Sequence, residues 1–146
     1  MKQLPALLKE DKYKKIKFRL TKTNHLLLKG TINGVSGNFI LDTGASNSCV
    51  GFDCVIQFNL TATDSPTLAA GAGAINMITQ VAHKNVLKIG RYTDSNFNLV
   101  VFDLSHVNAA LKQHKSKPVH GIIGADVLMK GKAVIDYANH YLFLKN

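Results

Sequence analysis

The residues best suited to chemistry in this sequence are Asp42, Thr43 and Gly44, which directly follow the apolar run Phe39-Ile40-Leu41. A buried strand that carries this run would deliver the Asp42 carboxylate to its own end. Gly44 would then allow a tight turn whose backbone amides point back at the carboxylate. Such a carboxylate can act as a general acid or base, but an Asx turn, in which the aspartate only bonds nearby backbone, explains the same three residues. The rest of the chain has to decide between the two interpretations.

The elements around this stretch are mostly strands, because apolar residues alternate with polar ones along much of the chain. The pattern predicts strands at 14–20, 25–32, 38–42, 50–58, 75–82, 85–89, 97–102, 132–137 and 140–145. A further buried strand contains Ile122-Ile123, and Asn33-Gly34 predicts a tight hairpin turn. The predicted fold class is therefore all-β, with one or two short helices.

Two segments have a helical pattern. The first follows Ser105, which can cap it, and its apolar face at i, i+3 and i+4 consists of Val107, Ala110 and Leu111. The second is short, at 125–129. The small residues at 71–74 lie between extended segments and suit a hairpin tip, since they lack the third glycine and the spacing of a dinucleotide-binding loop.

Length, composition and charge limit the classes of function. A chain of 146 residues with 46% hydrophobic residues fits one compact domain, which we place at 13–146 after a flexible lead-in at 1–12. The net charge of +9 is concentrated in residues 1–22, which hold eight Lys and Arg against two acidic residues. Apolar and basic residues alternate at 14–20, which favours the solvated face of a strand over a nucleic-acid site. We therefore expect no nucleic-acid partner.

Nothing in the sequence points to a membrane, a metal or a cofactor. No apolar run reaches the roughly 18 residues of a membrane span, and the apolar start is too short for a signal peptide. We therefore expect a cytoplasmic protein without a membrane partner. Cys49 and Cys54 are the only cysteines and the histidines are scattered, so no metal-ligand spacing results. Free thiols fit this compartment better than a disulfide, which the sequence leaves open.

Two segments together resemble aspartic proteases. Phe39 to Ser46 resembles the active-site loop of that family, and Ile122-Ile123-Gly124 resembles the hydrophobic segment with a glycine that supports this loop. The stretches 125–128 and 133–137 resemble the helix and the last strands of retropepsin-like domains, and 71–74 lies where the family has its substrate-covering flap. The resemblance runs in order over residues 24–146. It implies a closed β-barrel or sandwich of the retropepsin-like type.

The resemblance implies an aspartic endopeptidase that acts on a peptide or protein substrate without a cofactor. Such enzymes use two carboxylates that share one proton, and this chain has a single Asp-Thr-Gly. Asp126 and Asp136 lie in segments that are structural in the family. The second carboxylate is therefore expected from another copy, which implies a homodimer in which the two Asp42 side chains meet at the axis.

The resemblance also assigns roles to the neighbours of Asp42. Thr43 would hydrogen-bond across the dimer axis, and the Gly44 amide would donate to the Asp42 carboxylate. The expected substrate-binding residues are Ala45, Ser46, Gly71, Ala72, Gly73, Ala74 and Ile75, and the expected support of the site is Ile122, Ile123 and Gly124.

Some departures from the family pattern keep a second hypothesis open. Pepsin-like enzymes usually have a serine at the position of Ala45, and its absence predicts a pair of carboxylates that works at mildly acidic to near-neutral pH. Retroviral enzymes usually have a substrate-binding aspartate at the position of Ser46, and the flap here has no tyrosine of the pepsin kind. The alternative function is therefore a catalytically inactive retropepsin-like module for peptide binding or dimerisation. The substrate itself is not predicted.

Overall fold

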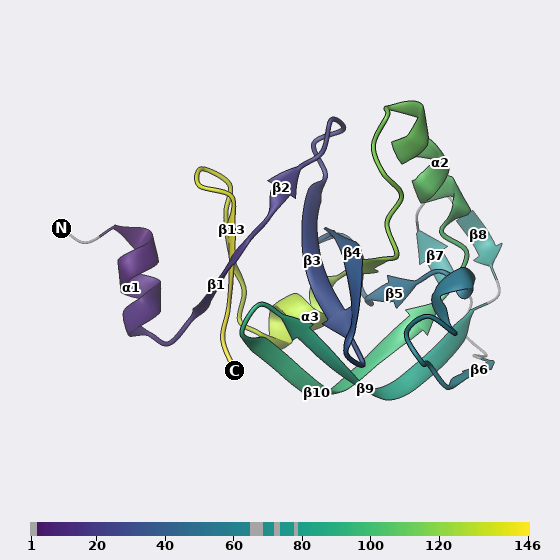
Figure 1. Cartoon of the computed structure of the whole chain (residues 1–146), viewed down its shortest axis with the longest axis horizontal. Coiled ribbons are helices and arrows are strands. Elements are labelled where there is room, and N and C mark those ends of the chain that lie inside the picture. The colour runs from purple at the N-terminus through teal and green to yellow at the C-terminus, as the bar shows by residue number, and fades with distance from the viewer. Residues whose placement is uncertain (1–2, 65–68, 72–73, 78) are drawn as a thin grey trace.

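The chain folds around a closed β-barrel (Figure 1). The computed structural model describes residues 3–64, 69–71, 74–77 and 79–146. Its largest sheet has the strand order β2 (Arg19–Leu20), β3 (Leu26–Ile32), β4 (Val35–Leu41), β11 (Gly121–Ile123), β5 (Cys49–Val50), β10 (Tyr92–Val101), β9 (Gln80–Ile89) and β6 (Ala62–Asp64). Because β3 also pairs with β9, the strands from β3 to β9 in this order close on themselves. The predicted all-β fold with a closed barrel is confirmed.

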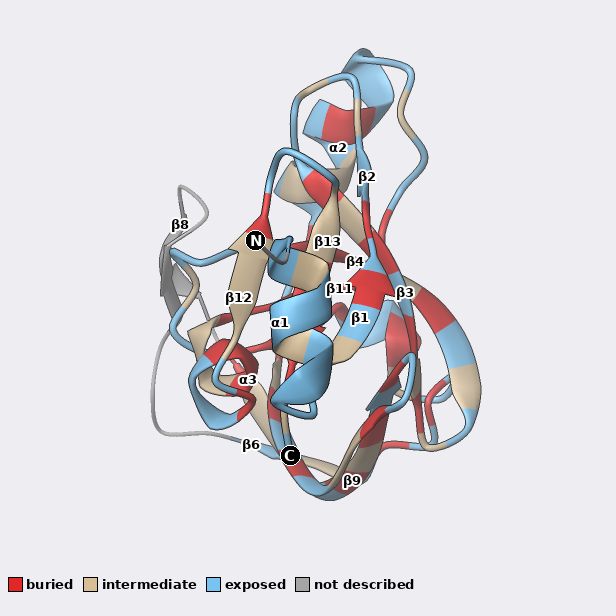
Figure 2. Cartoon of the chain, turned by 90° about the vertical axis from the view of Figure 1, so that its left-hand side faces the viewer, coloured by how far each residue is buried: buried red, intermediate tan, exposed pale blue. Residues whose placement is uncertain are grey.

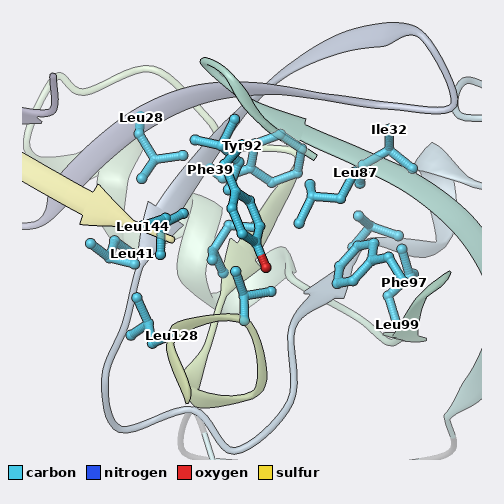
Figure 3. Packing of buried hydrophobic residues seen from close by; sticks show 14 of the residues in the cluster. Leu28, Ile32, Phe39, Leu41, Leu87, Tyr92, Phe97, Leu99, Leu128 and Leu144 are labelled. Carbon is cyan, nitrogen blue, oxygen red and sulfur yellow. The ribbon is translucent and has the colours of Figure 1, made fainter. Parts of the chain in front are cut away.

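The barrel interior is the main hydrophobic core. Figure 3 shows side chains of β3, β4, β9, β10 and the C-terminal segment meeting there, among them Leu28, Phe39, Leu87, Tyr92 and Leu144. Phe39, Leu87 and Tyr92 are at most 1% exposed. Because each large apolar side chain buried in this way contributes about 1.5–3 kcal/mol, the interior is the main source of the stability that holds the wall strands in place.

The β3–β4 hairpin confirms the predicted turn at Asn33-Gly34. These two residues have positive φ angles of 52° and 81°, and Ile32 pairs with Val35 across them. Asn-Gly adopts this backbone conformation with little strain, and its twist matches that of the strands. The Asn33 side chain also donates to the Phe58 carbonyl at 2.9 Å and accepts from the Val86 amide at 3.0 Å. The turn is thereby tied to two neighbouring segments.

A second apolar cluster lies on the opposite face of β4 and β11, under helix α2 (Ser105–Gln113). Its buried members are Ile40, Cys49, Phe102, Leu104, Leu111, Val119 and Ile122. Asn108 on α2 donates to the Val119 carbonyl at 3.1 Å and accepts from the Val119 amide at 2.8 Å, which fixes the helix to the segment that leads into β11. Ser105 does not cap the helix with its side chain as predicted; the Asp103 carboxylate accepts from the Ser105 amide at 2.8 Å instead.

A small sheet joins the two ends of the chain. Its strands are β1 (Lys14–Lys17), β13 (Tyr141–Leu144) and β12 (Val134–Asp136), and helix α3 (Ala125–Lys130) connects β11 to β12. Helix α1 (Leu4–Glu10), which the sequence did not predict, has no buried residue, and its ribbon in Figure 2 is pale blue and tan, without red. In the part of the chain that the structure describes, no helix is long and apolar enough to cross a membrane.

The predicted strand at 14–20 is divided between two sheets. β1 belongs to the terminal sheet and β2 to the barrel, and the break falls at Phe18. The Phe18 amide donates to the His140 carbonyl at 3.0 Å and its ring stacks on that of His140. The alternating pattern continues through the break, so the sequence gives no sign of it.

The predicted strand at 50–58 is wrong beyond Val50. β5 ends there, and the chain continues in the 3-10 helix η1 (Phe52–Cys54) and in turns. Cys54 and Phe58, four residues apart, are both buried. This is the spacing of helical turns and not the period of two that a strand shows.

The strands predicted at 75–82 and 85–89 are grouped differently in the structure. β8 (Ala74–Met77) pairs with β7 (Ala69–Gly71) in a separate hairpin. β9 then runs unbroken from Gln80 through the predicted gap. The strands on either side of the predicted hairpin tip pair with each other, with Gly71 opposite Ala74, while Ala72 and Gly73 lie outside the described residues.

Candidate active site

Asp42 lies at the end of a buried strand pair in the barrel wall. β4 and β11 run parallel with Leu41 opposite Ile123, and the Asp42 amide donates to the Ile123 carbonyl at 2.9 Å. Leu41 and Ile123 are buried, whereas Asp42, Thr43 and Gly44 are exposed. The carboxylate is thus carried by a rigid element and remains accessible to a substrate.

The turn after Asp42 has the predicted geometry. The Gly44 amide donates to Asp42 Oδ1 at 2.9 Å, and the Ala45 amide donates to the Asp42 carbonyl at 3.2 Å. The first bond fixes the orientation of the carboxylate. An ordinary Asx turn makes the same bond, so the support beneath the turn is what distinguishes this site.

The segment predicted as that support lies directly under the turn. The Ala125 amide donates to the Ala45 carbonyl at 2.7 Å, and the Gly124 amide donates to Ser48 Oγ at 2.9 Å. Together with the bond from Asp42 to Ile123, these contacts attach the loop to β11 and to the start of α3 at three points. A turn that is only a connection between strands does not need this number of bonds to a segment about 80 residues away.

Ser48 is a residue of this support that the sequence did not predict. Its side chain is 1% exposed, its hydroxyl donates to Asp126 Oδ1 at 2.7 Å, and its amide donates to Asp126 Oδ2 at 3.0 Å. One carboxylate therefore holds the far end of the loop that carries Asp42 through two bonds. No local pattern separates Ser48 from Ser46 or Asn47, because its partner is 78 residues away.

Asp126 and Asp136 both have structural partners, as the sequence analysis expected. Asp136 accepts from the Asn139 amide at 3.1 Å and from its side-chain amide at 3.0 Å, which closes the turn between β12 and β13. The hydrogen bonds from Asn139 lower the pKa of the Asp136 carboxyl below its usual value. Neither aspartate belongs to the turn that carries Asp42.

The thiols of Cys49 and Cys54 are buried beside the site and are not bonded to each other. Burial raises the pKa of Cys49 to about 12 and that of Cys54 to about 11, and the negative charges of Asp126 and Asp42 add to the effect at Cys49. Protonated thiols are poor nucleophiles and poor metal ligands. The preferred prediction of free thiols is confirmed.

The remaining predicted substrate-binding residues are only in part described. Ala45 is half-buried and Ser46 is exposed next to Asp42. Ala72 and Gly73 lie outside the described residues, as do the side chains of Gly71, Ala74 and Ile75, so their contacts to substrate stay predictions. Among the residues that the structure describes, no group of three or more His, Cys, Asp or Glu side chains could hold a metal ion.

The model of a family described as aspartyl protease matches residues 28–127, which is more than half of the chain. The chain belongs to the aspartyl protease family. No curated protein matches this chain in sequence. Solved structures do match. A retropepsin-like aspartic protease from Rickettsia conorii is 19% identical over 90% of each chain, with a TM-score of 0.57. EIAV protease complexed with the inhibitor HBY-793 is 20% identical over 81% of this chain and 98% of that chain, with a TM-score of 0.58, and the retroviral protease-like domain of Ddi1 from Leishmania major is 19% identical over 84% of this chain and 89% of that chain, with a TM-score of 0.58.

The fold of this chain is retropepsin-like, as the sequence resemblance implied. The structure brings together Asp42, Gly44, Ile123 and Gly124, which the sequence predicted as the centre of the site and its support. It places Gly71 and Ala74 on the separate β7–β8 hairpin.

Proposed function

We propose that this protein is an aspartic endopeptidase whose active site forms between two copies of the chain. The observation that supports this best is Asp42 itself: an exposed carboxylate, oriented by the Gly44 amide and mounted on a loop that Ile123 and Asp126 hold from below. Membership of the aspartyl protease family adds the class of reaction. A carboxylate held in this way can transfer protons without first having to be reoriented.

The proposed reaction needs two carboxylates and one water. Two carboxyl groups in contact share one proton, because both cannot ionise close together without a large cost. The ionised carboxylate takes a proton from the water while the water oxygen attacks the peptide carbonyl carbon. At the same time the protonated carboxyl gives its proton to the carbonyl oxygen. The resulting tetrahedral diol collapses as the carbon–nitrogen bond breaks: the carboxyl that took the water proton gives it to the leaving amine, and the other carboxylate takes a proton from the diol, which restores the single shared proton. The two groups titrate as one unit, so neither role belongs to one subunit.

The second carboxylate is assigned to another copy of the chain. The sequence holds a single Asp-Thr-Gly, and the carboxylates of Asp126 and Asp136 are bonded to Ser48 and Asn139. A two-fold axis through the exposed turn would bring Asp42 of one subunit against Asp42 of the other, since a C2 interface repeats the same surface. In this arrangement Thr43 is the residue that hydrogen-bonds across the axis.

The test is Asp42→Asn in the full-length protein. An asparagine can still accept from the Gly44 amide, so the fold and the dimer are expected to persist. Cleavage of a peptide library is expected to fall by more than about a hundredfold, because general acid–base catalysis by a positioned side chain contributes about that much or more. The matched control is Asp11→Asn, an exposed aspartate that pairs with Lys145 on the surface and should leave cleavage unchanged.

Two outcomes would contradict the proposal. Cleavage by Asp42→Asn at the wild-type rate would show that the activity comes from another group or a contaminant. No cleavage by the wild-type protein, together with a strictly monomeric state in sedimentation at high concentration, would favour the inactive peptide-binding module instead.

A further inference from the structure

Helix α1 presents leucine side chains to solvent at the outer end of the molecule. Leu4 is 44% exposed, Leu7 is 48% exposed, and no residue of the helix is buried. The two leucines are three positions apart, so they share one face of the helix. Figure 1 places the sheet of β1, β13 and β12 (the terminal sheet) between α1 and the barrel, and in Figure 2, which views the molecule from that side, α1 lies in front of this sheet. The barrel therefore does not cover the leucines.

The end of α1 is attached to the terminal sheet. The Tyr13 amide donates to the Leu8 carbonyl at 2.9 Å, and the Tyr13 hydroxyl donates to the Lys132 carbonyl at 2.8 Å. Asp11 forms an ion pair with Lys145, directly after β13, at 3.1 Å. These contacts hold the helix and its leucines on the outer side of the sheet.

Lysine side chains of β1 lie on the same outer side. Ile16 is buried in the main core, so its neighbours Lys15 and Lys17 point away from the barrel. Their ammonium groups lie 4.7 and 5.3 Å from the centre of the Tyr141 ring, which places both on one face of the sheet. Both lysines are exposed.

The charge of this region is positive. Residues 9–17 contain five lysines and two acidic residues. Lys9 on α1 and Lys12 just after it are exposed, and one of the acidic residues, Asp11, is paired with Lys145. A short apolar face bordered by lysines is typical of helices that lie on a membrane, where leucine enters the acyl region and lysine meets anionic headgroups.

The leucines distinguish between the two anionic partners that such lysines bind. A nucleic acid is bound through phosphate contacts, hydrogen bonds to base edges and stacking on aromatic rings, to which exposed leucines add nothing. On a lipid surface the same leucines leave water at a gain. The sequence predicted no membrane partner because it has no apolar run of about 18 residues, but a helix that lies on the surface needs no such run.

We propose that helix α1 and the outer face of the terminal sheet bind an anionic lipid surface. Leu4 and Leu7 insert between the headgroups, while Lys15 and Lys17 contact the anionic headgroups. The binding is reversible, because two leucines and a few lysines are a much weaker anchor than a spanning helix. The inference does not depend on the proposed peptidase function, since none of these residues belongs to the turn that carries Asp42.

The test is co-sedimentation of the full-length protein with lipid vesicles. One set of vesicles consists of phosphatidylcholine alone, and the other contains about one third phosphatidylserine. The protein should bind the second set at least about tenfold more tightly, because each lysine near an anionic surface adds to the attraction. High salt should reduce this difference by screening the charges. Equal binding to both sets, or binding to neither, would overturn the inference.

The contribution of the leucines is measured with the double variant Leu4→Gln and Leu7→Gln. Glutamine has nearly the helix propensity of leucine, so the helix is expected to persist. Binding to the anionic vesicles should fall by about tenfold or more, because two apolar side chains no longer leave water. The matched control is Ile56→Gln, which replaces an apolar side chain that is 89% exposed in another part of the chain. An equal loss of binding in the control and in the double variant would contradict a role of α1.

The contribution of β1 is measured with Lys15→Gln and Lys17→Gln together. Binding to the anionic vesicles should fall by about fivefold for each lysine. The matched control is Lys29→Gln with Lys88→Gln, which removes two exposed lysines from the barrel strands β3 and β9 and changes the net charge equally. It should leave most of the binding intact. If both pairs of substitutions weaken binding to the same extent, the net charge and not this surface is responsible, and the inference is wrong.

Two further outcomes would assign the surface to another partner. If the double leucine variant sediments as a smaller species than the wild type without vesicles, a second copy of the chain covers the leucines. If the protein binds a single-stranded oligonucleotide more tightly than anionic vesicles, and the double leucine variant does so equally, the lysines bind nucleic acid. Either result overturns the inference.

Discussion

Gly124 lies where the turn that carries Asp42 and the segment that supports it are in close contact. A Cβ atom at this position would lie 2.5 Å from the Ala45 carbonyl oxygen, which is shorter than van der Waals contact allows. This oxygen cannot move aside freely, because it also accepts from the Ala125 amide at 2.7 Å. A glycine is therefore required here by the proximity of the loop and not by its own backbone conformation.

We predict that Gly124→Ala damages both stability and activity. Forcing one extra methyl group into this contact should lower the free energy of unfolding by about 1–3 kcal/mol, measured by denaturant titration. Because the displaced atom belongs to Ala45, peptidase activity should fall by more than the loss of folded protein explains.

The matched control is Gly34→Ala, whose Cβ would meet nothing within 4 Å. It should cost about 1 kcal/mol through its positive φ alone and leave activity unchanged. Equal effects of the two substitutions on activity would contradict the role of Gly124.

The buried thiol of Cys49 predicts a loss of stability at alkaline pH. An unfolded thiol ionises near pH 9.0, whereas the folded one holds its proton to about 12. The folded state therefore binds more protons than the unfolded state between these values, so stability is complete below pH 9.0 and declines as the pH rises toward 12. In Cys49→Ala this part of the decline is absent. Between pH about 8 and about 10 its free energy of unfolding should fall by about 1 kcal/mol less than that of the wild type. An identical decline in both proteins would show that the thiol is accessible to water.

Among the strands and turns, the sequence predicted the features that neighbouring residues determine and missed the contacts that depend on residues far away in the chain. The Asn33-Gly34 turn and the end of β4 at Asp42 follow from short patterns, because turn geometry and strand alternation are set by neighbouring residues. The support at Ile123 and Gly124 was found only because its pattern resembles a known family. Ser48 was missed because the carboxylate that fixes it is 78 residues away.

The wrong predictions fall on segments whose apolar residues follow neither the spacing of a strand nor that of an amphipathic helix clearly. The stretch after Val50 is short and has apolar residues at mixed spacing, so it can be read as a strand or as helical turns, and burial of Cys54 and Phe58 decides for turns. Helix α1 is absent from the prediction because, with no buried residue, it lacks the amphipathic pattern that packing against a core produces. The position of α2 over Ile40 was equally beyond the sequence, since only the fold brings the two together.

Across the whole molecule, the exposed lysines of β1 and the turn that carries Asp42 lie on different elements. On β1, Ile16 is buried while Lys15 and Lys17 are exposed, with their ammonium groups 4.7 and 5.3 Å from the centre of the Tyr141 ring. This agrees with the prediction of a solvated strand face. The terminal sheet that carries these lysines is separate from the barrel wall that carries Asp42. A chain with one exposed catalytic carboxylate on its own barrel is half of the proposed active site.

The proposed homodimer predicts that an inactive chain also inactivates the wild-type chain with which it pairs. When Asp42→Asn protein is mixed with the wild type and the subunits are allowed to exchange at low concentration, dimers form at random. A mixed dimer has one carboxylate and one amide, which cannot share a proton as two carboxylates do. Activity per wild-type chain should therefore fall to about one half in an equal mixture and to about one tenth with a ninefold excess of the variant. Adding wild-type protein in the same amounts is the control, and it should raise total activity at least in proportion. If activity per wild-type chain stays constant at every ratio, while sedimentation shows that mixed dimers are present, the active site lies within one chain and the proposed dyad is wrong.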